Sequence, residues 1–224
     1  MEPRHFEVEL QALKNRLLRM GALVEERVHA AMQALMERRI EAAEEVVAGD
    51  DEVNSLQIEI DDRCLKLLAL QNPRATDLRL ITAAMKINAD LERIGDQAVN
   101  IAENAIKVAD HPPLRPILDL PRMAEMAEAM TRDSLDAFVR RDANMARDVL
   151  ARDDEVDQLK DAIFRVLLTH MMADPGTIER ALSLILVSRN LERIADHATN
   201  IAEDVIFVVE AKDVRHHHEE RSAG

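Results

Sequence analysis

Hydrophobic residues recur at steps of three and four along most of the chain, which is the spacing of one face of an α-helix. The pattern predicts helices over residues 6–38 and 41–70, with a kink at Gly49, and a third helix from about residue 76 to 109. No stretch alternates polar and apolar residues as a half-buried strand would. The chain is therefore predicted to be all-α.

A break between two halves is predicted where three prolines fall within residues 111–116, because they leave no ladder of helical hydrogen bonds. We expect one bundle over residues 1–110, a second over residues 111–215 and a frayed polar tail over residues 216–224.

The second half repeats the helical pattern of the first. Helices are expected over residues 121–141 and 177–210, with one more between them that follows a turn at residues 142–144. Asp174 is predicted to cap the last helix, whose first turn holds a proline. Six helices in two tandem, internally duplicated three-helix bundles are the expected fold.

The repeat is strongest in one acidic segment. Residues 90–103 return as residues 190–203 with ten of the fourteen positions identical. On a helix, the acidic residues of this segment share one face and its apolar residues the opposite one. A second acidic motif, at residues 50–54, returns at residues 153–157.

Antiparallel pairing is expected to bring the two acidic motifs of each half to one height of its bundle. If the first turn centres near residues 72–73, residues whose numbers sum to about 145 lie level with each other. The two predicted clusters are Asp50, Asn54, Glu92 and Asp96 in the first half, and Asp153, Asp157, Glu192 and Asp196 in the second.

Two interpretations of these clusters follow from the residues. Four oxygen-bearing side chains on adjacent helices suit a cation such as Mg, Mn, Fe or Zn. Acidic residues on the outward face of a bundle are equally typical of a solvated surface held by neighbouring charges. His197 alone is more typical of a hydrogen-bonded histidine than of a metal ligand, and the single Cys64 of a buried thiol.

Charge and composition exclude several other functions. A net charge of −14, divided evenly between the halves, argues against binding to nucleic acid or to anionic lipid. The start of the chain has no apolar signal-peptide core and no apolar run is long enough to span a bilayer, so a cytoplasmic protein is expected. No phosphate-binding glycine loop or catalytic triad is present, which favours a protein that is not an enzyme.

Several motifs, in the same order and spacing in both halves, resemble the PhoU family, which serves the bacterial phosphate transport system. They are the Leu-Glu-Arg-Ile-(Gly/Ala)-Asp element at 91–96 and 191–196, the Asp-Asp-Glu-Val element at 50–53 and 153–156, the turn at 71–79, and residues 212–216. The resemblance implies a cytoplasmic homodimer that negatively regulates the phosphate-starvation response. It also implies that the dimer links the ATPase subunit of the phosphate ABC transporter to a sensor histidine kinase and meets the membrane only through these partners.

The same resemblance implies metal clusters, of a divalent or trivalent ion, held by acidic pairs spaced four residues apart. Asn54 departs from that pattern, since an amide keeps one oxygen ligand but loses the charge, so the first cluster is expected to be the weaker. Two alternatives stay open. One is a carboxylate-bridged metal-binding or storage protein, although no Glu-x-x-His pair on facing helices supports it; the other is a helical adapter without metal.

Overall fold

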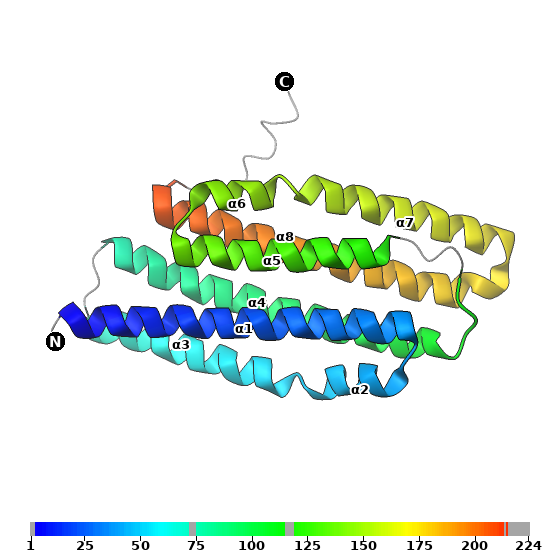
Figure 1. Ribbon diagram of the computed structural model, residues 1–224, viewed down its shortest axis with the longest axis horizontal. Helices are drawn as coiled ribbons and strands as arrows, with labels where there is room; N and C mark the ends of the chain where they lie inside the picture. The colour runs from blue at the N-terminus through cyan, green and yellow to red at the C-terminus, as the bar shows by residue number, and fades with distance from the viewer. Residues whose placement is uncertain (1–2, 72–74, 115–118, 213, 215–224) are drawn as a thin grey trace, which may run out of the picture.

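The computed structural model describes residues 3–71, 75–114, 119–212 and 214, and within them the chain contains only helices (Figure 1). The predicted turn at Asn72 and Pro73, and the tail at residues 216–224, lie outside the described residues. The elements are α1 (Pro3–Glu37), α2 (Ile40–Ala48), α3 (Asp51–Gln71), α4 (Ala75–Ala109), α5 (Leu120–Arg140), α6 (Ala143–Leu150), α7 (Asp153–Ala173), the 3₁₀ helix η1 (Pro175–Thr177) and α8 (Ile178–Glu210).

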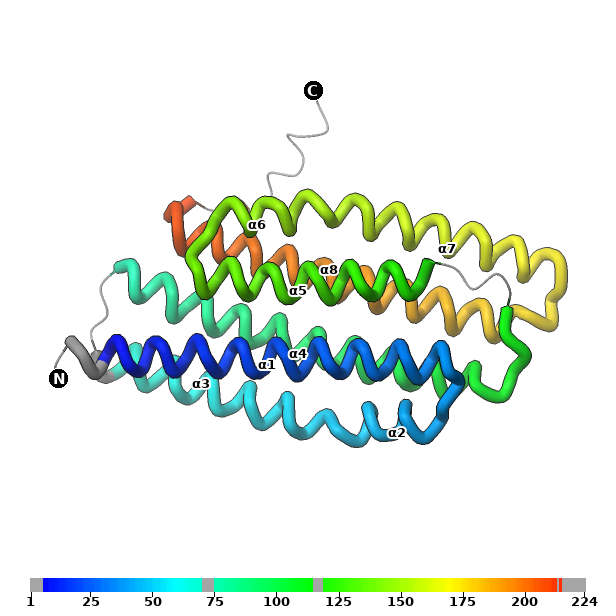
Figure 2. Tube along the Cα trace, in the orientation of Figure 1, coloured from blue at the N-terminus to red at the C-terminus, as the bar shows by residue number. Residues whose placement is uncertain are grey.

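The helices form two three-membered bundles side by side, which confirms the predicted architecture. In the first, α1 and α4 run alongside a third member made of α2 and α3; in the second, α5 and α8 run alongside α6 and α7 (Figure 2). The bundles meet mainly through α4 against α8, with α1 against α5. Because one hydrophobic core continues through both bundles, the domain limits at 1–110 and 111–215 stay a prediction.

The middle member of each bundle is broken, so the described residues hold eight α-helices where the sequence pattern predicted six continuous ones. In the first half the break lies at Gly49, as expected for the kink. Arg27, on α1, donates from its guanidinium to the carbonyls of Val46 (3.3 Å) and Gly49. A Cβ at position 49 would come within 2.8 Å of Nη1 of Arg27, so a larger residue here would have to displace the end of that guanidinium.

The corresponding break in the second half uses a different contact. There Arg152 stands at the break itself and donates to Asp133 on α5 over 2.6 Å. Both breaks interrupt the helix directly before an acidic pair. The second break has no glycine to mark it, and a periodicity of apolar residues continues across such a cap, which is why the sequence pattern did not show this interruption.

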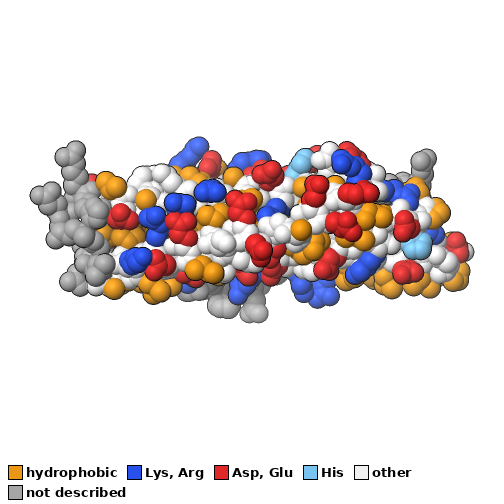
Figure 3. All heavy atoms as spheres, turned by 90° about the horizontal axis from the view of Figure 1, so that it is seen from below, with side chains coloured by type: hydrophobic (Ala, Val, Ile, Leu, Met, Phe, Trp, Pro, Cys, Tyr) orange, Lys and Arg blue, Asp and Glu red, His pale blue; other side chains and the backbone are white. Residues whose placement is uncertain are grey.

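The apolar face of the duplicated segment lies in the core. Leu91 and Ile101, on α4, are buried, and so are Leu191 and Ile201 on α8. The remaining core is built mainly from Leu, Ile, Val, Ala and Met side chains, together with Phe138, and Cys64 is fully buried among them. Charged side chains of both signs cover the surface seen in Figure 3. Packing of the apolar face thus holds the acidic face outward.

Asp174 caps the start of the last helical segment, as predicted. Its carboxylate accepts a hydrogen bond from the backbone N–H of Gly176 over 2.9 Å. The capped element is the three-residue η1, which leads directly into α8. This cap fixes the turn between α7 and α8 and hence the register of their acidic residues.

Candidate functional site

The acidic residues of the first half come from the start of α3 and the middle of α4. Asp50 lies in the break before α3 and Asn54 one turn inside it, while Glu92 and Asp96 lie one turn apart on α4. Burial and the charge of Asp96 raise the pKa of Glu92, and burial and the charge of Asp50 raise the pKa of Asp96. The predicted members are thus close enough to sense one another's charge.

One oxygen of this first cluster lacks a donor. The amide of Asn54 donates to Oδ2 of Asp50 over 2.8 Å, but Oδ1 of Asp50 is buried without a hydrogen-bond partner among the described residues. Leaving a buried acceptor unpaired costs about 1–3 kcal/mol. A hard cation coordinated by this oxygen would remove that cost, so the donor set fits an oxygen-liganded metal.

The second cluster lies on the first turn of α7 and the middle of α8. Burial, the charge of Glu192, and those of Asp153 and Asp157 together raise the pKa of Asp196 to about 6. The four carboxylates are therefore brought close enough for the charges of the other three to reach Asp196.

The second cluster contains a lysine that is not among its predicted members. The ammonium of Lys160 donates to Oδ1 of Asp157 over 2.7 Å and to Oε1 of Glu192 over 3.0 Å, and these hydrogen bonds raise the pKa of Lys160. Its counterpart in the first half is Gln57. The sequence does indicate the contact with Asp157, because a lysine three residues after an aspartate lies on the same helix face.

His197 lies beside this cluster but contacts the other bundle. Its Nδ1 is 3.0 Å from Oδ1 of Asp90, a buried carboxylate on α4. Since a carboxylate only accepts, the ring N–H donates. The interpretation of His197 as a hydrogen-bonded histidine is confirmed, and the contact joins α4 to α8.

Neither cluster has its side chains arranged around a common point. Among the residues that the structure describes, no three His, Cys, Asp or Glu side chains are grouped so that they could hold a metal ion. The eight predicted ligands therefore stay a prediction, and binding would need their side chains to turn toward one another.

In the described part of the chain, no helix combines the length and hydrophobicity that crossing a membrane requires.

The fold defines a class of helical protein in which one three-helix bundle is duplicated and each copy carries an acidic face. Comparison with known proteins places the same duplication in a known family. The family model described as "PhoU domain" matches residues 17–105 and again residues 120–205. The chain belongs to the PhoU family.

Relatives and solved structures match along nearly the whole chain. A phosphate-specific transport system accessory protein PhoU homolog from Aquifex aeolicus is 43% identical over 210 residues, covering 94% of this chain and 95% of the relative. A PhoU homolog of the same description from Pseudomonas aeruginosa is 41% identical over 214 residues, covering 95% of this chain and 88% of the relative.

Two crystal structures share the fold. PhoU from Pseudomonas aeruginosa superposes with a TM-score of 0.87 at 40% identity, covering 92% of this chain and all of that one. The phosphate transport system regulatory protein PhoU from Streptococcus pneumoniae gives a TM-score of 0.87 at 30% identity, covering 93% and 99%.

Proposed function

We propose that this protein is a non-enzymatic accessory of phosphate transport that negatively regulates the phosphate-starvation response. In this role it links the ATPase subunit of a phosphate ABC transporter to a sensor histidine kinase, acts in the cytoplasm as a homodimer and reaches the membrane only through these partners. The observation that carries the proposal is the match of both halves to the PhoU domain, together with relatives described as accessory proteins of phosphate transport.

We further propose that the acidic clusters bind a divalent or trivalent cation of the Mg, Mn, Fe or Zn kind. Asp50, Glu92 and Asp96 would hold it in the first half, and the unpaired oxygen of Asp50 supports this assignment. The bound cation would neutralise the crowded carboxylates and thereby stabilise the folded chain.

The order of affinity that we propose is opposite to the one expected from carboxylate number alone. Lys160 already places a positive charge between Asp157 and Glu192, and a metal would have to displace it. The corresponding Gln57 carries no charge. We therefore propose that the first cluster binds a cation more tightly than the second.

Deletion of the gene in its host tests the regulatory role. Phosphate-starvation genes are expected to be expressed in high phosphate when the protein is absent, and a plasmid copy is expected to silence them again. Repression that persists without the protein would contradict the proposal.

Cell fractionation tests whether the protein reaches the membrane only through its partners. In a strain that lacks both the transporter and the kinase, the protein should remain in the soluble fraction.

Purified protein tests the absence of catalysis. It should hydrolyse neither ATP nor a phosphomonoester above the background of the preparation. Turnover that follows the chain through purification, and is lost when one of its own residues is changed, would contradict the non-enzymatic role.

A further inference from the structure

A cavity lies where the linker between the bundles passes the ends of α1 and α4 and the beginnings of α5 and α8. Its volume is about 60 Å³, and its lining comes from these helices and from residues 111–114 of the linker. In Figure 1 this place is the end of the molecule at which α1 ends and α8 begins. Both bundles therefore contribute to one cavity.

Most of the residues that line this cavity are apolar. Leu35 and Val108 come from the first bundle, Leu120 and Leu184 from the second, and the prolines at 112 and 113 from the linker. Because one water-sized group takes about 10–15 Å³ of such a volume, the cavity has room for about four to six of them. A short branched aliphatic group has that size.

Two arginines bring positive charge to the cavity, one from each bundle. Arg38, directly after α1, donates from its guanidinium to the carbonyls of Ala109 and His111. Arg180, near the start of α8, donates to the carbonyl of Pro112 over 2.5 Å. Since His111 and Pro112 are consecutive residues, the two guanidiniums are held beside the same short segment of the linker.

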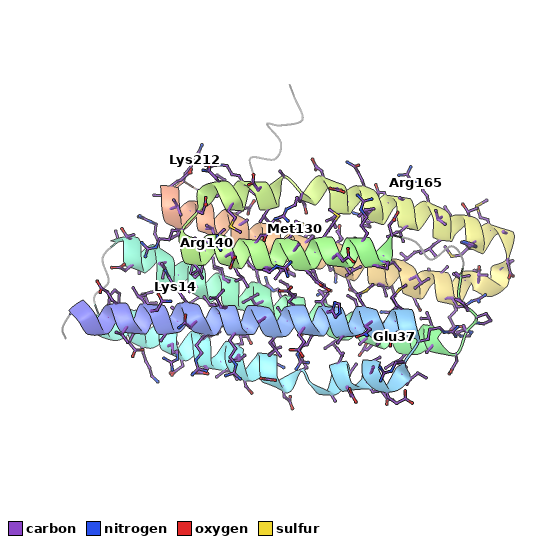
Figure 4. All side chains as sticks on the ribbon, viewed as in Figure 1. Lys14, Glu37, Met130, Arg140, Arg165 and Lys212 are labelled. Carbon is purple, nitrogen blue, oxygen red and sulfur yellow. The ribbon has the colours of Figure 1, made fainter. Side chains whose placement is uncertain are left out.

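These guanidiniums have no carboxylate partner in the part of the chain that the structure describes. Glu37, next to Arg38 in the chain and labelled at the end of α1 in Figure 4, pairs instead with Arg39 over 3.6 Å. None of the described residues that line the cavity is acidic, although the chain carries a net charge of −14. A guanidinium has five N–H donors, and the linker carbonyls use only some of them. The remaining donors and the two positive charges favour an anion.

The duplicated fold does not require the second of these arginines. Residues of α4 and α8 correspond at an offset of 100, so Arg180 corresponds to Leu80, whose side chain is fully buried. The linker itself has no second copy, because it joins the two copies of the bundle. The cavity is therefore a feature of the contact between the bundles and not of either bundle alone.

We propose that this cavity binds a small organic anion, namely a carboxylate that carries a short branched aliphatic group. The aliphatic group fills the apolar part of the cavity, and the carboxylate accepts hydrogen bonds from Arg38 and Arg180, whose planar forks match its geometry. Inorganic phosphate fits less well, because it has no apolar part to place against the aliphatic lining. Since the ligand contacts both bundles, its binding stabilises their contact. The site goes beyond the proposed function and does not depend on it.

Titration of the full chain with 4-methylpentanoate, followed in amide NMR spectra, tests the site. Saturable shifts should appear at residues 108–114 and 180–184, and the melting temperature should rise as the site fills. A ligand of this size is expected to bind in the millimolar range, so the absence of saturable shifts up to about 50 mM would overturn the proposal. Saturable shifts confined to other segments would overturn it as well.

Three further probes test the class of ligand. 4-Methylpentanamide keeps the shape without the charge, while acetate and inorganic phosphate keep a charge without the aliphatic group. Each should bind at least about tenfold more weakly than 4-methylpentanoate. Equal affinity for the amide would overturn the recognition of an anion, and equal affinity for acetate or phosphate would overturn the recognition of an aliphatic group.

The variant Arg180→Gln tests the guanidinium, because it removes the charge but keeps a donor for the linker carbonyl. It should weaken the binding of 4-methylpentanoate about tenfold and leave the affinity for the amide within about twofold of wild type. Arg165→Gln, on α7 and outside the cavity (Figure 4), is the matched control and should bind as wild type does.

An Arg180→Gln protein that binds the carboxylate as tightly as wild type would overturn the assignment. If the variant is less stable, an unchanged affinity for the amide still separates a lost charge from a damaged cavity. These measurements use the purified chain alone, so their failure would leave the regulatory role intact, and that role is tested separately by repression in cells.

Discussion

The two acidic clusters occupy equivalent places in two copies of one bundle, yet they are balanced differently. The first has three carboxylates with the neutral Asn54 and Gln57; the second has four carboxylates with Lys160. The formal charge is therefore the same, −3, at both. The additional carboxylate of the second half is matched by the ammonium of Lys160, so the number of carboxylates alone does not set the charge that a cation would meet.

The contact between the bundles shows the same divergence. Asp90 and His197 form a partly buried hydrogen bond from α4 to α8. The positions that correspond to them in the other half are Asn190 and Gln97, which are also buried but uncharged. The interface between the bundles thus contains an ionisable pair, Asp90 and His197, and two amides, Asn190 and Gln97, at the positions related to that pair by the duplication.

The largest expected effect comes from breaking that ionisable pair. His197→Ala leaves the buried carboxylate of Asp90 without its ring donor and should lower the free energy of unfolding by about 2 kcal/mol. Gln97→Ala, at the corresponding position, is the control and should cost less, because its Oε1 has no partner among the described residues. Urea denaturation measures both, and equal losses would contradict the distinction between the two sides.

Replacing the ionisable pair Asp90 and His197 by amides extends this comparison. The double variant Asp90→Asn with His197→Gln copies the uncharged pair of the other side. It should recover most of the stability that His197→Ala loses, since no cavity remains and no buried carboxylate has lost its ring donor. A double variant as unstable as His197→Ala would show that the ionisable pair is needed for packing rather than for charge.

The buried thiol gives a second, pH-dependent difference between the halves. Burial and the charge of Asp61 raise the pKa of Cys64 from 9.0 to about 12. Its equivalent in the second half is Leu167, which is also buried. Because the unfolded thiol ionises near 9 and the folded one does not, stability is complete below pH 9 and is lost as the pH rises toward 12.

Cys64→Leu, which copies the second half, removes this dependence. Relative to the variant, wild-type protein should lose about 1.4 kcal/mol of unfolding free energy between pH 8 and pH 10. At pH 7 the two should differ by less than about 1.5 kcal/mol, since the replacement stays apolar. Parallel pH profiles for the two proteins would contradict the buried, protonated thiol.

The sequence predicted the helical fold, the duplication and the level acidic pairs because each rests on local periodicity or on the length of an antiparallel turn. The breaks at Gly49 and Arg152 were not predicted in full, since they depend on contacts with Arg27 and Asp133 from distant segments. The place of Lys160 was not predicted because an ammonium is not a metal ligand, and its contact with Glu192 depends on the packing of α7 against α8.

The most direct test of the different charge balance is calorimetric titration with Mn²⁺ of chains that keep one cluster. Asp96→Asn weakens the first site, and in that background Lys160→Gln should tighten binding at the second about fivefold, because no ammonium has to be displaced. Asp196→Asn weakens the second site, and there Gln57→Lys should weaken binding at the first by a similar factor. Affinities unchanged by either substitution would contradict the account, since Lys160 would then not stand in the place of a cation.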